Sequence, residues 1–290
     1  MPWDLGAARR GTDMGPTAMR YAGLYEALGA LGLQVVDGGC IEVPVSEGHV
    51  QSQPRLRYLP EIVTVCRDVA GVVGGILSRH AMPLILGGDH SVTIGMLAGR
   101  RTAGLSGGVI WLDTHGDLNT EETSPSGNIH GMALAVATGR GVADLVRIGR
   151  GSTVTERQTV IVGVRSVDRL ERAVLHQSEV TVFTMKDIDQ RGIGAVVTQA
   201  IAVATDGGAQ RFHLSVDLDV LDPLYAPGVG TRVRGGLTYR EAHLEMELAS
   251  DSGLVGSMDV VELNPTLDER NCTATLAVEL IASALGEGIY

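Results

Sequence analysis

The sequence has few cysteines, few aromatic residues and no long apolar run. Its three cysteines, Cys40, Cys66 and Cys272, are an odd number without metal-like spacing, which argues against a disulfide framework and favours a reducing compartment. We expect all three to be small buried hydrophobes. No stretch approaches the roughly 18 consecutive apolar residues of a membrane span, and the N-terminus lacks the apolar segment of a signal peptide. These absences predict a soluble, cytoplasmic protein that does not bind membranes.

Basic runs are also absent. The chain has 23 Lys and Arg against 34 Asp and Glu, a net charge of -11 and a pI near 5.1. This balance argues against a nucleic acid or an anionic membrane as partner. The 290 residues are 44% hydrophobic, enough for one large core, and the 39 glycines suit many tight turns between strands and helices.

Short runs rich in β-formers alternate with longer helical patterns. The predicted strands are 83–86, 109–112, 159–164, 180–183, 212–216 and 255–263. The predicted helices are 16–31, 61–79, 91–100, 167–176, 192–205 and 238–249, the last opening with a capping box of Thr238 and Glu241. This alternation predicts a single-domain α/β fold, a three-layer α/β/α arrangement around a mainly parallel sheet. Ligands of such sheets bind beyond the carboxyl ends of the strands.

Two acidic segments follow predicted strands. In WLDTHGDLN, Asp113, His115 and Asp117 alternate directly behind an apolar run. Alternate side chains of an extended strand share one face, so these three groups would point the same way. About a hundred residues later, FHLSVDLDVLDP ends another apolar run with Asp217 and Asp219. Two such clusters at two strand ends predict one dinuclear metal site.

His90, in GGDHS after an earlier strand, completes the predicted ligand set. Taken singly, an Asp after a strand is more often a helix cap, and an isolated buried His is more often structural. Together, four carboxylates and two imidazoles at one edge would repel one another strongly without a cation. This set lacks thiolates and suits Mn, Mg or Fe(II) better than structural zinc. Two such ions can lower the pKa of a bridging water.

Five motifs occur in an order that carries a family resemblance: GGDHS at 87–91, DTHGD at 113–117, SGNIHGM at 126–132, SVDLDVLDP at 215–223 and VVELNP at 260–265. With them the chain resembles the arginase or ureohydrolase superfamily, its bacterial members in particular. These are manganese enzymes that hydrolyse guanidino compounds. The resemblance implies one arginase-like catalytic domain over residues 1–290, two Mn(II) ions per subunit, and a homotrimer or homohexamer.

The resemblance also assigns roles to matching residues. It implies that one ion is held by His90, Asp113, Asp117 and Asp217, and the other by Asp113, His115, Asp217 and Asp219. Asp117 would also orient the attacking hydroxide. His130 matches the proton shuttle, a role that suits a group titrating near neutral pH. Glu262 matches the acid that anchors the guanidinium, which a carboxylate can pair with through two parallel hydrogen bonds.

Family members differ in the residues that bind the end of the substrate away from the guanidino group. Asn119, Ser126 and Asn128 match residues that bind an amino-acid carboxylate, and an amide and a hydroxyl are suitable partners for it. Asp168 matches the acid that engages the α-amino group, and Thr231 lies in the same specificity region. The resemblance therefore implies hydrolysis of L-arginine to L-ornithine and urea.

Several alternatives stay open. Another ureohydrolase would act on a different carboxylated guanidino or formimino compound, as a guanidinobutyrase or formimidoylglutamase does, and an agmatinase on agmatine. A metallophosphoesterase also uses Asp-x-His, GD and GNH elements, but GNIH here carries an extra residue. A non-enzymatic binding protein on this fold is disfavoured because every catalytic position is filled.

Four features depart from the family pattern or stay undecided. Arg232 stands where proline is usual, which we expect to bend the loop near Thr231 and favour a more anionic substrate. Ser166 replaces an acid of many animal arginases, as it commonly does in bacterial ones. The family's strand before the segment 2–7 is missing, and we expect the native start to lie upstream. Finally, Leu276, Ile281, Leu285 and the tail Ile289-Tyr290 suggest an apolar C-terminal helix that joins subunits or packs on its own sheet.

Overall fold

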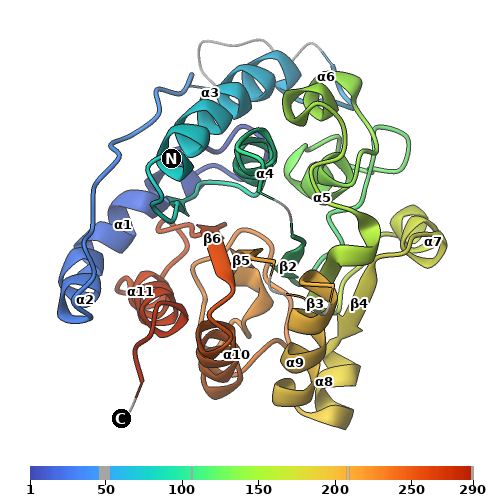
Figure 1. The fold of residues 1–290 in the computed structure, drawn as a ribbon. Helices are drawn as coiled ribbons and strands as arrows, with labels where there is room; N and C mark the ends of the chain where they lie inside the picture. Colours follow the sequence, from blue (N-terminus) through green and yellow to red (C-terminus); the bar gives the residue numbers. More distant parts are fainter. Residues whose placement is uncertain (46–52, 106, 207, 209, 289–290) are drawn as a thin grey trace.

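The computed structural model describes residues 1–45, 53–105, 107–206, 208 and 210–288. Within them, six parallel strands form one sheet between two layers of helices (Figure 1). The strands are β1 (Leu84–Leu86), β2 (Val109–Leu112), β3 (Thr159–Val164), β4 (Thr181–Thr184), β5 (Phe212–Asp217) and β6 (Val255–Val261). Each matches a predicted strand to within two residues at either end. The single α/β domain class is confirmed.

Helices connect successive strands and cover both faces of the sheet. The α-helices are α1 (Gly15–Tyr21), α2 (Leu24–Ala30), α3 (Leu59–Leu77), α4 (Val92–Thr102), α5 (Ala133–Ala137), α6 (Ala143–Val146), α7 (Arg169–Gln177), α8 (Met185–Arg191), α9 (Ile193–Ala204), α10 (Tyr239–Asp251) and α11 (Cys272–Ala284). Short 3-10 helices are η1 (Thr12–Met14), η3 (His130–Met132), η4 (Arg147–Gly149), η5 (Glu156–Gln158) and η6 (Leu218–Val220).

The strand order β1-β6-β5-β2-β3-β4 places the two acidic segments side by side. Strands β2 and β5 pair directly, with Leu112 opposite Val216. The next residues along these strands are Asp113 and Asp217, so their carboxylates emerge next to each other at the same edge. Strand β1, which precedes His90, is separated from β5 only by β6.

Both faces of the sheet are buried. Along β2, Ile110 and Leu112 belong to one apolar cluster, whereas Val109 and Trp111 belong to the other. Alternate strand residues point to opposite faces, so a strand covered on both sides is apolar throughout. Figure 1 shows α3 and α4 above the sheet and α9, α10 and α11 below it. This double burial fixes the strand ends that carry the acidic residues.

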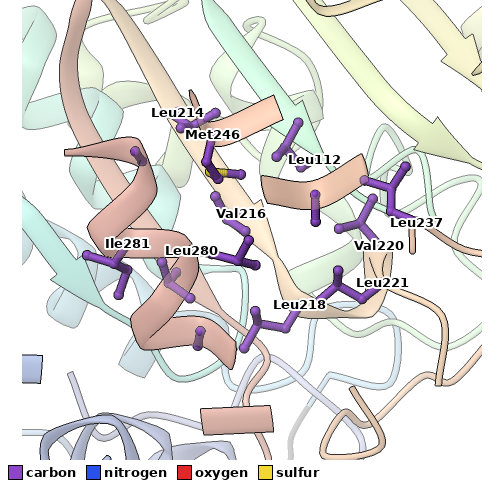
Figure 2. Close-up of a cluster of buried hydrophobic side chains, with 14 of the residues drawn as sticks. Leu112, Leu214, Val216, Leu218, Val220, Leu221, Leu237, Met246, Leu280 and Ile281 are labelled. Carbon is purple, nitrogen blue, oxygen red and sulfur yellow. The ribbon is translucent and has the colours of Figure 1, made fainter. Parts of the chain in front are cut away.

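The lower cluster joins the sheet to the last two long helices. In Figure 2, Leu214 and Val216 of β5 lie among side chains that include Met246 of α10 and Leu280 of α11. These residues are at most 1% exposed. At roughly 25 cal/mol per Å² of buried apolar surface, each large aliphatic side chain here contributes about 1.5 to 3 kcal/mol to folding.

The helix predictions need correction in two respects. The predicted helix 16–31 is two helices, α1 and α2, because Gly23 between them adopts φ 90°, which a regular helix cannot contain. Helices α5, α6 and α8 were not predicted, although Thr184 and Asp187 form a capping box at the start of α8. The capping box predicted at Thr238 is confirmed, since the Glu241 amide donates to the Thr238 hydroxyl at 3.3 Å.

The expectations for the cysteines and for the C-terminal helix have mixed outcomes. The cysteines form no disulfide, but only Cys66 is buried, and the prediction of burial is wrong for Cys40 and Cys272. Helix α11 packs on its own sheet, with Leu276 and Ile281 buried in the lower cluster and Leu285 packed against it. The tail Ile289-Tyr290 lies outside the described residues. None of the described helices is both long enough and apolar enough to cross a membrane.

Glu245 on α10 is an ionisable group inside the lower helix layer. Its side chain is 1% exposed and neither carboxylate oxygen has a hydrogen-bond partner, so burial raises its pKa to about 8. A folded-state pKa above the unfolded value means that stability falls as pH rises from about 4.5 to 8. We expect Glu245→Gln to leave the melting temperature nearly unchanged at pH 5 and to raise it by at least about 2 °C at pH 9.

Thermal unfolding at both pH values measures this difference. Glu247→Gln is the matched control, because Glu247 lies on the same helix but is half-buried and bonded to Arg240 at 2.8 Å. The control should gain no stability with rising pH. If the melting temperatures of the parent and Glu245→Gln differ by the same amount at pH 5 and at pH 9, ionisation of Glu245 does not destabilise the folded protein.

Candidate dinuclear metal centre and substrate cavity

The carboxyl ends of β2 and β5 carry the predicted acidic cluster. Asp113, Asp217 and Asp219 are at most 3% exposed, and Asp117 is 7% exposed. Local turns hold two of them in place, since the His115 amide donates to Asp113 Oδ1 at 2.7 Å and the Asp219 amide to Asp217 Oδ1 at 2.8 Å. Four carboxylates are thus buried at one edge of the sheet.

His90 reaches this cluster from the turn after β1. The turn passes close to the N-terminal segment, and a Cβ on Gly88 would lie 1.7 Å from the Trp3 carbonyl oxygen, so only glycine fits there. The His90 ring stacks on Trp111 with centroids 4.0 Å apart. Its Nδ1 atom is buried without a hydrogen-bond partner. That atom faces carboxylate oxygens of three aspartates: Asp113 at 3.2 Å, Asp117 at 3.1 Å and Asp217 at 3.3 Å.

His115 forms a second, adjoining group. Its Nδ1 atom lies 3.2 Å from Asp113 Oδ1 and 3.2 Å from Asp219 Oδ2. The Thr231 hydroxyl donates to the same Asp219 oxygen at 2.5 Å. Two sets of ligand atoms therefore lie close enough to hold a cation each, and they share Asp113: His90, Asp113 and Asp217 in one, and Asp113, His115 and Asp219 in the other.

The electrostatics of the cluster explain why it needs positive charge. Burial, followed by repulsion from Asp219 and Asp113, raises the pKa of Asp217 well above its usual value. Burial and the nearby Asp113 raise the pKa of Asp117 to about 6. Burial alone would lower the pKa of His90, but its contacts with three aspartates raise it well above normal. These carboxylates are close enough to compete for protons, and a bound cation relieves the same repulsion.

Two of the predicted functional residues have unusual backbones. Asp117 has φ 50° and Glu262 has φ 65°, left-handed conformations that cost non-glycine residues about 1 kcal/mol or more. Both are held by hydrogen bonds: the Asp117 carbonyl accepts from Leu134 and Ala135, and the Glu262 amide donates to Gly88. Strained residues of this kind cluster at functional sites, where the surrounding structure enforces them.

Glu262 and His130 form a buried pair beside the cluster. Glu262 Oε1 lies 2.9 Å from His130 Nδ1 and also accepts from the His90 amide at 2.9 Å. Burial would raise the pKa of Glu262, but His130 lowers it below its usual value. Burial would lower the pKa of His130, whereas Glu262 raises it to about 9. At neutral pH this pair is therefore a carboxylate beside an imidazolium that can donate a proton.

A cavity opens above the cluster. It is lined by His115, Asp117, Asn119, Ser124, Ser126, Asn128, His130, Gly131, Ser166, Asp168, Glu171, Asp217 and Thr231. All five residues predicted to bind the far end of a substrate are in this lining, together with the predicted shuttle. His90, Asp113, Asp219 and Glu262 are more deeply buried and lie beneath it. The structure thus brings together every residue predicted for the site.

Polar contacts order part of the cavity wall. Asn119 Nδ2 donates to Asp168 Oδ2 at 3.1 Å, which joins the predicted carboxylate and amino subsites. Arg232 is exposed and donates to the Leu267 carbonyl at 2.6 Å. It is not among the residues that line the cavity. The guanidinium that we expected to favour a more anionic substrate is thus bonded to the segment between β6 and α11.

Glu171 is a cavity residue that the sequence interpretation missed. Its carboxylate is 2% exposed and accepts from the amides of Leu118 at 2.9 Å and Asp168 at 3.3 Å. Glu171 is the third residue of α7 and forms a capping box with Asp168. The spacing of these two acids would have revealed this box, since the same pattern was recognised at Thr238.

Comparison with known proteins identifies the family. The model of the Arginase family matches residues 1–286. The chain is 47% identical to an arginase of Bacillus caldovelox over 99% of this chain and 96% of that protein. It is 46% identical to an arginase of Bacillus subtilis (strain 168), again over 99% of this chain and 96% of that protein. The chain belongs to the Arginase family.

Solved structures agree with this assignment. The structure of arginase from Bacillus caldovelox superposes with a TM-score of 0.95 at 46% identity, covering 100% of this chain and 97% of that chain. Formimidoylglutamase from Bacillus subtilis is more distant, with a TM-score of 0.77 at 25% identity, covering 98% and 84% of the two chains. The fold is therefore shared by proteins named arginase and by one named formimidoylglutamase.

The donor set fits the dinuclear metal centre that the family implies. The unpartnered His90 Nδ1 faces only carboxylate oxygens, and the remaining donors are oxygen atoms and one further imidazole. Hard, oxygen-rich sets with imidazole are typical of Mn and related divalent ions. The residues present thus fit a dinuclear metal centre, both in the chemistry of their donor atoms and in their arrangement.

Proposed function

We propose that this protein hydrolyses the guanidino group of L-arginine to give L-ornithine and urea. The observation that carries the proposal is the arrangement of two His/Asp groups, sharing Asp113, directly beneath a cavity lined by Asn119, Ser126 and Asn128. Relatives at 46 to 47% identity over nearly the whole chain are named arginase, which supports the same activity.

The proposed metal ligands divide into two sets. We assign His90, Asp113, Asp117 and Asp217 to one ion and Asp113, His115, Asp217 and Asp219 to the other, with Asp113 and Asp217 shared. Two divalent cations supply a nucleophilic hydroxide near neutral pH. Manganese is the metal that we propose for this oxygen-rich set.

The cavity wall is proposed to bind the amino-acid end of the substrate. Asn119, Ser126 and Asn128 offer amide and hydroxyl donors for a carboxylate, and Asp168 offers a negative charge for the α-amino group. Thr231 borders the same region and fixes Asp219 through its hydroxyl. An arginine bound in this way would direct its guanidinium toward the acidic cluster.

Three residues then act on the reacting group. Glu262 pairs with the guanidinium and holds its planar carbon in position. Asp117 accepts a hydrogen bond from the attacking hydroxide and aims it at this carbon. As the bond from the carbon to the side-chain nitrogen breaks, His130 donates a proton to that nitrogen and Asp117 takes the proton of the added hydroxyl group, so that ornithine leaves as an amine and urea remains.

The second candidate is another ureohydrolase with a carboxylated guanidino or formimino substrate. The structural similarity to formimidoylglutamase from Bacillus subtilis favours it as the alternative. Higher identity to proteins named arginase favours arginine over it and over agmatine. The family resemblance further predicts a homotrimer or homohexamer, and the composition of the sequence predicts a cytoplasmic location.

A substrate panel tests the proposed specificity. With added Mn²⁺ and equal enzyme, we expect urea release to be fastest from L-arginine and slower from agmatine, which lacks the carboxylate, and from 4-guanidinobutyrate, which lacks the α-amino group. Formiminoglutamate hydrolysis, followed as formamide release, should be weak. A higher kcat/KM for any of these compounds than for arginine would contradict the proposed substrate.

His130→Asn tests the proton donor. We expect kcat to fall by about 10²- to 10⁴-fold, because the leaving amine loses its acid, while Mn²⁺ binding remains. In the parent, activity should decline as pH rises above about 9, where His130 loses its proton. The matched control is His80→Asn, since His80 is exposed and its φ of 58° suits asparagine. Unchanged kcat in His130→Asn would remove this residue from the mechanism.

A further inference from the structure

A row of buried polar side chains runs through the sheet away from His90. His90 Nε2 lies 2.8 Å from Ser215 Oγ, and Ser215 donates to Asp259 Oδ1 at 2.7 Å. His213 Nε2 lies 3.0 Å from Asp259 Oδ2, and His213 Nδ1 lies 2.8 Å from Ser257 Oγ. All five side chains belong to residues with 0% exposure. This row links a proposed metal ligand to the interior of the sheet.

Strand pairing explains why these residues form a row. Ser215 is paired with Asp259, and His213 with Ser257, across β5 and β6. Residues two apart on a strand share a face, so the four side chains adjoin on one side of the sheet. Helix α4 covers that side and supplies Thr93, which donates to Asp259 Oδ2 at 2.8 Å. A protein interior tolerates such a group of polar atoms only when each is satisfied.

The proton positions along the row follow from the donor and acceptor capacities. Arg100 can only donate, and it donates to Ser257 Oγ at 2.6 Å. Burial lowers the pKa of His213, so its ring is neutral, and it accepts from Ser257 while donating to Asp259. Burial raises the pKa of Asp259, but His213, His90 and Ser215 together lower it below its usual value. Asp259 is therefore a carboxylate, and it accepts from the Ser215 and Thr93 hydroxyls.

The same count of donors and acceptors determines the tautomer of His90. The single hydroxyl proton of Ser215 is donated to Asp259, so Ser215 Oγ must accept at its other contact. The proton between His90 and Ser215 therefore belongs to His90 Nε2. In a neutral ring this leaves the Nδ1 lone pair directed at Asp113, Asp117 and Asp217. Stacking on Trp111 holds the plane of the ring.

We propose that Ser215 and Asp259 are positioning residues that hold His90 in the metal-binding tautomer and thereby set the affinity of one of the two metal positions. This inference rests on the proposed metal function. The two positions differ because His90 belongs to one group of ligands and His115 to the other. The ring of His115 lies against Asp113 and Asp219, away from the row. Loss of the row weakens the position of His90 and spares that of His115.

Titration of metal-free protein with Mn²⁺ by isothermal calorimetry tests the inference. We expect Ser215→Ala to weaken one of two binding events by about 10- to 100-fold, the range found when an outer partner of a ligating histidine is lost. The other event should stay within about threefold of the parent. Asp259→Asn should act in the same direction. Two unchanged binding events in Ser215→Ala would overturn the inference.

Matched variants separate positioning from a general loss of stability. Ser283→Ala removes another buried serine hydroxyl that lies 2.9 Å from a histidine Nδ1, that of His243, in the lower helix layer. It should lower the melting temperature about as much as Ser215→Ala but leave both binding events unchanged. His115→Asn identifies the events, because it should weaken the one that Ser215→Ala spares. Weakening of the same event by both variants would contradict the inference.

A measurement on the parent covers the case in which the variants do not fold. In protein labelled with ¹⁵N-histidine and loaded with diamagnetic Zn²⁺, we expect His90 to carry its proton on Nε2. A proton on Nδ1 would overturn the inference. Absence of Mn²⁺ binding by the parent would instead contradict the proposed metal function, so the two failures are distinguishable.

Discussion

Mutual repulsion among buried carboxylates is the constraint on which this structure depends. Asp113, Asp217 and Asp219 emerge from neighbouring parallel strands and are nearly inaccessible to solvent. Charges removed from water at this spacing are tolerated only with protons or cations between them. The two imidazoles that adjoin them are arranged as partners of such cations. The site therefore requires bound positive charge, and the metal ions of the proposed reaction would supply it.

The fold provides the rigidity that this arrangement needs. The central strands are covered on both faces, so their ends cannot shift without disturbing two apolar clusters. The less regular backbones of Asp117 and Glu262 are placed on that frame by hydrogen bonds to neighbouring turns. The polar row that leads from Ser257 to His90 has fixed proton directions, and we propose that it orients one metal ligand from within the sheet. Rigid support of this kind is what a metal centre requires from its surroundings.

The acidic cluster could be predicted from sequence because two simple rules operate there. An apolar run marks where a strand ends, and the carboxyl ends of neighbouring parallel strands meet at one edge of the sheet. The expected alternation along an extended strand was wrong, because β2 ends at Leu112 and Asp117 lies beyond it with φ 50°. The proposed roles of Glu262 and His130 came from the motif resemblance, since neither residue carries a pattern that periodicity explains. The structure adds that these two form a pair.

Other features depend on contacts that no local pattern encodes. Ser215 and Asp259 are separated by 44 residues, and they become neighbours only through the pairing of β5 and β6. Polar residues inside buried strands look unfavourable until that register is known. The break between α1 and α2 depends on the positive φ of Gly23. Glycine can adopt this angle but also adopts others, so its presence alone does not predict the break. The burial of Glu171 could not be predicted from the pattern of α7, whose other residues are largely exposed, because it depends on the approach of the Leu118 amide from another segment.

Anomalous X-ray diffraction from crystals grown with Mn²⁺ tests the central claim most directly. Our account predicts two anomalous peaks, one adjoining His90 Nδ1, Asp113, Asp117 and Asp217, and the other adjoining His115 Nδ1, Asp113, Asp217 and Asp219. A single peak, a peak away from Asp113, or coordination through His90 Nε2 would contradict it.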